Sequence, residues 1–235
     1  MQKILFFLCL IITNMVIAQD VEIISKGNFS SEEKPKVFAF LETKTDTMPL
    51  KYVACFKSAG PYKKTTISDL FSKIKIEAQT LGANCFRLKS YNYDSTNITI
   101  VLDTYFGDDS LLHRNFANHE KNVVFVFCSD RLDNEKYSLK VNGQKIEFTS
   151  GTYIKLPLKE GQELKLNKGG ITGETIWLNY KQDKSAVFLT ATSLGLGGPT
   201  PPGTVGLAFN TGRLNYLDGN LGYLLAQVLK QSEHL

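Results

Sequence analysis

Between Val123 and Ala191 the chain alternates short apolar runs with turn residues, and this pattern restricts the fold more than any other feature. The runs recur about every 7 to 12 residues and are rich in β-branched and aromatic side chains, as in β-sandwich strands. Asn142-Gly143 favours a two-residue hairpin turn, because both residues tolerate positive φ. We predict an antiparallel sandwich with strands at 123–128, 137–141, 144–148, 153–156, 163–166, 175–180 and 186–191.

A smaller unit precedes the sandwich. From Ile67 to Leu81 the apolar residues are spaced three and four apart, which predicts a helix with one buried face. Thr66 is suited to be its N-cap and Gly82 to be its left-handed C-cap. Strand-like runs flank the helix at 37–41, 52–57, 84–90 and 97–105. The expected fold class is therefore α+β, with a β-β-α-β-β unit followed by an antiparallel sandwich and a C-terminal helix.

The first eighteen residues have the pattern of a secretory signal peptide. Lys3 precedes the apolar run Ile4 to Ile12, and Val16 and Ala18 place small residues at positions −3 and −1 of a cleavage site. Nine apolar residues span about 14 Å as a helix, far less than a bilayer core of roughly 30 Å. We therefore expect cleavage after Ala18, a periplasmic or extracellular location, and no transmembrane segment in the mature chain.

The expected organisation follows from these boundaries. The final segment carries apolar residues at helical spacing, which predicts a helix from Leu221 to Gln231 with Asn220 as its N-cap. Its apolar face would close the sandwich or dock on another protein or a membrane. The predicted parts are a signal peptide at 1–18, a flexible leader at 19–36 with a short strand at 21–24, an α+β domain at 37–106, a linker at 107–121 with a short helix, and a sandwich domain at 122–235.

The run from Ala78 to Ser90 contains Leu81-Gly82-Ala83-Asn84 and resembles a helix-to-strand junction, A-x-x-L-G-A-N, of small bacterial envelope domains. The Rcs stress-sensor lipoproteins and the YbjQ-like domains have this junction, which implies that the helix ends at the glycine. The chain lacks the lipid-acceptor cysteine and the proline-rich leader of the sensor lipoproteins. The hairpin from Tyr137 to Ile146 and the segments that follow it are similar in pattern to exported bacterial β-sandwich modules of unknown function. Neither resemblance assigns a site residue.

Composition excludes several classes of function. The chain has 235 residues, 43% hydrophobic and 21% charged, with a formal charge of +4 that falls to +3 without Lys3. Its basic residues are scattered singly among acidic ones, so nucleic acid is not an expected partner. Neither a Gly-x-Ser-x-Gly elbow nor a phosphate-binding Gly-Lys-Ser/Thr loop occurs in the sequence. We assign no catalytic, cofactor-binding or metal-ligating residue, and expect no cofactor.

Three cysteines remain after cleavage, namely Cys55, Cys85 and Cys128. Each lies in a strand-like apolar run, where a small buried side chain and a disulfide are both compatible with the sequence. Among the disulfides, Cys55 to Cys85 is favoured, because the two strands are expected in one sheet.

Two further features are candidates for contacts with a partner. The glycine-proline loop at 195–203 is expected to be exposed and unpaired, and its residues Gly197, Pro199, Pro201 and Pro202 are suited to partner contact. Trp177 and Tyr180 fit either the sandwich core or a platform for a sugar.

The expected function is that of a non-enzymatic binding module for an envelope protein or glycan. One alternative is a hydrolase with a site at the domain junction, built from Cys128, His113, His119 and Asp109. Another is a redox-responsive envelope stress sensor. His113 and His119 lie six residues apart, a spacing that does not place two metal ligands on one helix face.

Overall fold

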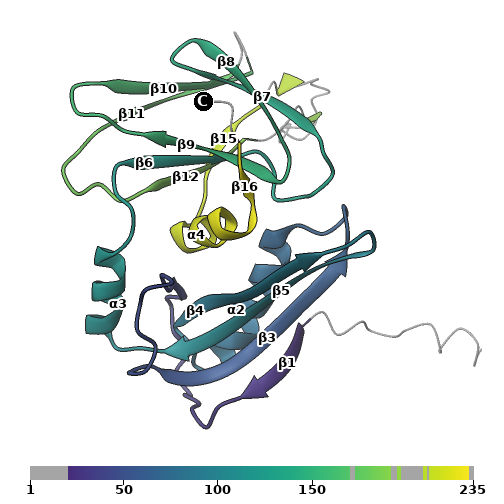
Figure 1. Ribbon diagram of the computed structural model, residues 1–235, viewed down its shortest axis with the longest axis vertical. Coiled ribbons are helices and arrows are strands. Elements are labelled where there is room, and N and C mark those ends of the chain that lie inside the picture. Colours follow the sequence, from purple (N-terminus) through teal and green to yellow (C-terminus); the bar gives the residue numbers. More distant parts are fainter. Residues whose placement is uncertain (1–20, 170–172, 192–194, 197–208, 211, 233–235) are drawn as a thin grey trace, which may run out of the picture.

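The computed structural model describes residues 21–169, 173–191, 195–196, 209–210 and 212–232. Two β-rich units meet across the helix α4 (Gly219–Val228), as Figure 1 shows. One unit contains a five-stranded sheet with helix α2 (Ile67–Thr80), and the other contains two facing sheets. The predicted α+β class is confirmed, with the sandwich after the smaller unit and a helix near the C-terminus. The signal peptide predicted at 1–18 lies outside the described residues.

The strands of the first unit are β1 (Val21–Lys26), β2 (Ala39–Phe40), β3 (Lys51–Pro61), β4 (Cys85–Tyr93) and β5 (Asn97–Phe106). They form one sheet in the order β1-β3-β5-β4-β2, with antiparallel neighbours except for the parallel pair β2 and β4. The short strand expected at 21–24 is present and extends to Lys26 as β1. Because β1 pairs with β3, this part of the expected flexible leader is an edge strand of the sheet.

Helix α2 covers one face of this sheet and begins and ends where its sequence predicts. The Thr66 hydroxyl oxygen accepts a hydrogen bond from the Asp69 N–H at 3.0 Å. Beyond the C-cap Leu81, Gly82 has a φ of +90°, a left-handed conformation that favours glycine. The stripe that packs against β3 and β5 is fully buried and consists of Ile67, Leu70, Phe71, Ile74 and Ala78.

The strands of the second unit are β6 (Val123–Phe127), β7 (Lys136–Val141), β8 (Gln144–Thr149), β9 (Thr152–Pro157), β10 (Glu163–Lys168), β11 (Glu174–Asn179), β12 (Val187–Ala191), β15 (Leu214–Tyr216) and β16 (Lys230–Gln231). One sheet has the order β11-β10-β7-β8 and is antiparallel. The other has the order β15-β12-β6-β9-β16 and includes two parallel pairs, β6 with β12 and β9 with β16. The sandwich is therefore partly mixed. Asn142 and Gly143 both have positive φ, as the predicted hairpin turn requires.

The start of the glycine-proline loop differs from expectation. Gly195 and Leu196 form the short strand β13, which pairs with β14 (Phe209–Asn210). The prediction that this segment stays unpaired is wrong for these two residues, because ladder pairing uses backbone groups that glycine also has. The contact residues proposed in this loop, Gly197, Pro199, Pro201 and Pro202, lie outside the described residues.

Helix α3 (Asp109–Ala117) occupies the segment predicted as a linker with a short helix. The Asp108 carboxylate accepts a hydrogen bond from the Leu111 N–H at 2.9 Å and caps the helix. Asn115 and His119 are buried although the surrounding segment is largely exposed. The connection between the units therefore also contributes side chains to their interface.

Helix α4 lies between the two units, so the expectation that it closes the sandwich describes only one of its faces (Figure 1). It begins two residues earlier than predicted, because Asp218 and not Asn220 is the N-cap: the Asp218 carboxylate accepts hydrogen bonds from the N–H groups of Asn220 and Leu221. It ends at Val228, three residues earlier than predicted, and Lys230–Gln231 pair with β9 instead.

The apolar core continues from one unit into the other through α4. Along β6, Val124 and Val126 face the second sandwich sheet, while Phe125 and Phe127 belong to the cluster around α4. The Tyr223 ring of α4 stacks on Phe40 of the first unit at 5.5 Å and meets Phe188 of the sandwich edge-on at 4.7 Å. The two units therefore share one buried interface.

Candidate functional site

A cleft of about 230 Å³ opens between the two units near the C-terminal end of α4. The first unit contributes three aromatic rings to its lining, Tyr62, Tyr91 and Tyr93. The sandwich and the segment after α4 contribute polar groups, among them Asn134, Thr149 and Lys230. We name this feature the tyrosine cleft; it combines rings from one unit with hydrogen-bonding groups from the other.

A β-bulge in β4 directs two of the rings into the cleft. The register against β5 shifts between Leu88 and Ser90, so Tyr91 lies opposite Ile100 and Tyr93 lies opposite Ile98. Residues directly opposite each other point to the same side of a sheet, and both isoleucines face the core. In a regular strand that kept Leu88 on this face, Ser90 and Asn92 would follow it there. The bulge therefore turns the two tyrosines toward the sandwich.

The three rings lie at the turn end of the β4–β5 hairpin, which hydrogen bonds and ring stacking hold in place. Tyr62 and Tyr93 have ring planes only 2° apart with centroids at 5.8 Å, and the Tyr62 N–H donates to the Thr96 carbonyl at 2.8 Å. The Asp94 carboxylate accepts three hydrogen bonds within the turn, two from Thr96 and one from the Asn97 N–H. These bonds to the charged form lower the Asp94 pKa.

On the opposite wall, some polar groups have hydrogen-bond partners within the protein and others do not. Ser150 is buried; its hydroxyl donates to Asp133 at 2.6 Å and accepts from the Glu135 N–H at 3.0 Å. In the part of the chain that the structure describes, the side chains of Asn134, Thr149 and Lys230 have no hydrogen-bond or ion-pair partner. Donors and acceptors on this wall are therefore open to a ligand.

The size and chemistry of the cleft suit a small, flat, hydroxylated group. Its volume lies below the roughly 300 Å³ at which typical small-molecule sites begin, so it accommodates about one ring. Aromatic faces bury the apolar side of such a ring, and nearby amide, hydroxyl and ammonium groups bind its polar edge. Burial raises the pKa of the Tyr91 hydroxyl, with Tyr93, Tyr62 and Asp130 adding to the effect, so this group is a neutral donor.

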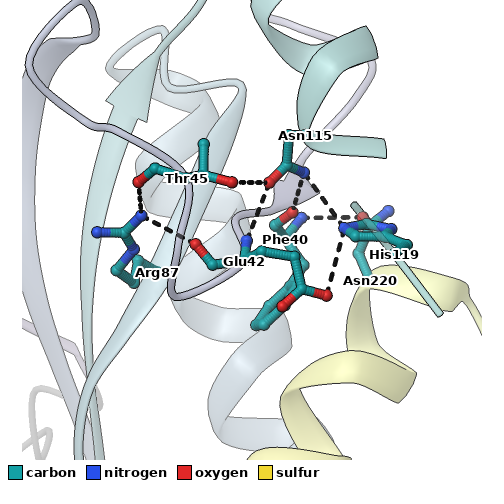
Figure 2. Close-up of polar contacts among 7 residues, drawn as sticks. All are labelled: Phe40, Glu42, Thr45, Arg87, Asn115, His119 and Asn220. Atoms are coloured by element: carbon teal, nitrogen blue, oxygen red, sulfur yellow. Dashed lines mark hydrogen bonds and ion pairs between the residues drawn. The ribbon is translucent and has the colours of Figure 1, made fainter. Parts of the chain in front are cut away.

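A buried polar network occupies the junction at the other end of α4 (Figure 2). The Asn115 carboxamide oxygen accepts from the Glu42 N–H at 2.9 Å and from the Thr45 hydroxyl at 2.7 Å. Its nitrogen donates to the Phe40 carbonyl at 2.8 Å. Asn220 of α4 accepts from the Phe40 N–H at 2.9 Å, and Arg87 donates to the Glu42 and Thr45 carbonyls. This junction network fixes β2, α3 and α4 relative to one another.

The junction network also reaches the buried ring of His119. The Asn115 nitrogen lies 3.3 Å from His119 Nε2, whereas the buried His119 Nδ1 has no hydrogen-bond partner among the described residues. Burial among the rings of Tyr223 and Phe116 lowers the His119 pKa, and burial raises the Glu42 pKa. The 3.9 Å approach of Glu42 Oε1 to Nε2 is therefore not an ion pair at neutral pH.

Of the two alternatives for the cysteines, the structure has the small buried side chains: Cys55, Cys85 and Cys128 are free buried thiols, and the disulfide considered between Cys55 and Cys85 is not formed. Cys55 lies opposite Asp103 and Cys85 opposite Tyr105, so β5 lies between the two cysteine strands. Two strand spacings amount to about 9.6 Å, beyond the roughly 7 Å that a disulfide spans between Cα atoms. Burial raises the pKa of Cys55 to about 11 and that of Cys85 to about 12, which makes both poor nucleophiles.

The residues considered for a hydrolase are not assembled. Cys128 lies in the core between the two sandwich sheets, whereas His119 packs on Tyr223 across the other face of β6. His113 and Asp109 lie on α3, where His113 is exposed. Within the described ranges, no group of three or more His, Cys, Asp and Glu side chains is placed to hold a metal ion.

Trp177 is 55% exposed and Tyr180 is 37% exposed, so the assignment of these rings to the sandwich core is wrong. Trp177 lies on the outer face of the edge strand β11, with Lys165 Nζ 5.8 Å from its ring. No partner ring or cleft accompanies it among the described residues, so the sugar platform considered for this pair is less developed than the tyrosine cleft.

No described helix combines the length and apolar character that crossing a membrane requires. Comparisons with known proteins add no assignment: no family model matches the chain, and no similar protein was found among curated proteins or solved structures.

Sequence reasoning did not identify the tyrosines of the cleft. Tyr91 and Tyr93 follow the strand predicted at 84–90, which the structure extends to Tyr93, and Tyr62 follows Gly60-Pro61. This cluster of rings beside a turn is a visible signal. The bulge that turns Tyr91 and Tyr93 to one side, however, has no local signature in the sequence.

Proposed function

We propose that this protein is an exported, non-enzymatic binding module of the bacterial envelope that holds a glycan in the tyrosine cleft. The observation that carries the proposal is the combination of Tyr62, Tyr91 and Tyr93 with the unpaired Asn134 and Lys230 in one concave site. Saccharides have an apolar face and a polar edge, and this arrangement offers a complement to each.

Binding, not hydrolysis, is the better fit to the cleft. Glycoside hydrolysis uses a pair of carboxylates around the scissile bond, and none of the described lining residues is Asp or Glu. The nearest acidic side chains are engaged elsewhere: Asp130 accepts from the Ser68 N–H at 2.6 Å, and Asp133 accepts from Ser150 and Glu135.

A glycan array tests the proposal directly. The purified protein should bind a subset of bacterial saccharides, and Tyr62→Ala and Tyr93→Ala should each weaken that binding at least about tenfold, which is about 1.4 kcal/mol. Tyr216→Ala is the matched control, because Tyr216 is 65% exposed on β15 and lies outside the cleft. The proposal fails if no saccharide binds, or if the two cleft variants bind as the wild type does.

Export is tested separately. Material isolated from the bacterial envelope should begin at Gln19, which Edman degradation or mass spectrometry of the intact protein measures. A chain that retains Met1 in the cytoplasmic fraction would contradict the envelope assignment and leave the saccharide site to be judged by the array.

A further inference from the structure

We propose that the tyrosine cleft selects saccharides that carry a carboxylate, with Lys230 as the group that recognises the charge. This inference rests on the proposed function and names the ligand class more narrowly. It follows from the charge, the position and the surroundings of one side chain.

Lys230 is the only charged residue among the described residues that line the cleft. It is exposed and has no acidic partner in the described part of the chain. A lysine among the residues that line an aromatic cleft brings a positive charge that a neutral saccharide does not balance. A carboxylate would form a charge-assisted hydrogen bond there, roughly twice as strong as a neutral one.

The backbone holds this lysine in a defined place. Lys230 belongs to the strand β16. The Lys230 N–H donates to the Gly151 carbonyl at 3.3 Å, and the Ser232 N–H donates to the Tyr153 carbonyl at 2.7 Å. The preceding Leu229 is buried in the core shared by the two units. Lys230 therefore lies on an anchored strand and lines the cleft together with Thr149 and Asn134.

The acidic side chains nearest the cleft are bound to other groups, and none of the described ones pairs with Lys230. The Asp133 carboxylate accepts hydrogen bonds from the Ser150 hydroxyl and the Glu135 N–H. Burial acts to raise the Asp133 pKa, but these bonds to the charged form outweigh it and the pKa is lowered. Asp130 is bound to the first turn of α2. On the tyrosine side, Lys63 adds a second positive charge, with Nζ 5.7 Å from the centre of the Tyr62 ring. Lys230 and Lys63 are therefore the positive groups beside the rings, and Asp130, whose charge acts on the Tyr91 hydroxyl, is the negative one.

The test is an array on which each acidic saccharide stands beside its carboxyl-reduced counterpart. Suitable pairs include uronic-acid oligosaccharides, sialylated oligosaccharides and muramic-acid-containing fragments of peptidoglycan. We expect binding at least about tenfold stronger for the acidic member, weakening as ionic strength rises because salt screens exposed charges. For the strongest pair, Lys230→Gln should reduce the affinity for the acidic member to that of the reduced member, and Lys230→Arg should retain the preference.

Lys140→Gln is the matched control, since Lys140 is an exposed lysine of β7 outside the cleft. Equal binding of acidic and reduced members overturns the inference but leaves the glycan proposal standing. A preference that survives in Lys230→Gln also overturns it. Absence of binding to every saccharide overturns both proposals.

Discussion

The two ends of helix α4 meet the first unit in opposite ways. At its N-terminal end, Asn220 and the residues of the junction network use nearly all their polar groups on one another, and Asn115 is 1% exposed. Beyond its C-terminal end, Lys230 and Asn134 line a cleft with polar groups that no described residue uses. One interface thus contains a closed polar cluster and an open polar cleft.

This difference separates polar residues that hold the fold from those available to a ligand. A buried donor or acceptor without a partner costs about 1 to 3 kcal/mol, so the Asn115 bonds matter to the fold; Arg87 Nε and His119 Nδ1 are the two buried side-chain atoms of the network that lack a partner among the described residues. Exposed groups in the cleft carry no such penalty, because water satisfies them until a ligand replaces it. The two ends should therefore respond oppositely to mutation, with the network governing stability and the cleft governing binding.

The largest loss of stability is expected for Asn115→Ala. The change removes the Asn115 contacts to the Phe40 carbonyl, the Glu42 N–H, the Thr45 hydroxyl and His119 Nε2. We expect the free energy of unfolding to fall by roughly 3 kcal/mol, measured by urea denaturation. Asn118→Ala, at an exposed position one turn further along the chain, should cost less than about 1 kcal/mol. Equal costs for the two variants would contradict a structural role for the network.

Sequence reasoning succeeded where the determining interactions are local. Helix α2 was predictable from Thr66 to Gly82, because its cap, its apolar period and its terminal glycine all lie within the segment. The N-cap of α4 was assigned to the wrong residue, since Asn220 gives its side chain to Phe40, 180 positions earlier in the chain. The Asp218 carboxylate takes over the cap.

The candidate site was less predictable than the fold. The cleft depends on a bulge in β4 and on a sandwich turn more than fifty positions later, and neither contact has a local pattern. Trp177 illustrates the same limit: its strand was predicted, but which face of that strand is buried depends on which side meets the second sheet.

A second variant, Gly222→Ala, tests whether the stability of the protein and glycan binding in the cleft both depend on the position of α4. A Cβ at Gly222 of α4 would lie 2.3 Å from the Phe188 ring, so Gly222→Ala forces α4 away from β12. We expect a loss of about 2 kcal/mol in the free energy of unfolding together with weaker glycan binding. Gly219→Ala is the control in the same helix, because its Cβ would meet Phe188 at an ordinary 3.9 Å. If both variants are as stable as the wild type, the packing of α4 is not what holds the units together.

Acidification should also lower the free energy of unfolding, through His119 in the junction network, but by less than Asn115→Ala or Gly222→Ala. The His119 pKa is lowered by burial, so below about pH 6.5 the unfolded chain binds a proton that the folded chain does not. The free energy of unfolding should therefore fall as the pH drops through 6.5. The raised Glu42 pKa acts in the opposite direction, adding stability as the pH falls toward 4.5.

Thermal denaturation between pH 7.5 and 5.5 measures the contribution of His119. The His119→Gln variant should lack the loss of stability that begins at pH 6.5, whereas His113→Gln, at an exposed position of α3, should retain it. A wild-type stability that stays constant or rises over this range would show that His119 is protonated without penalty in the folded protein.

The smallest effect on stability is expected for the cleft itself. Tyr93 is 50% exposed and Lys230 is exposed, so Tyr93→Ala and Lys230→Gln should each change the free energy of unfolding by no more than about 0.5 kcal/mol. Urea denaturation beside the Asn115→Ala series measures this on one scale. A cost for Tyr93→Ala as large as that for Asn115→Ala would mean that the tyrosine rings hold the two units together. Its loss of glycan binding could then no longer be attributed to a direct contact, because both ends of α4 would serve the same structural purpose.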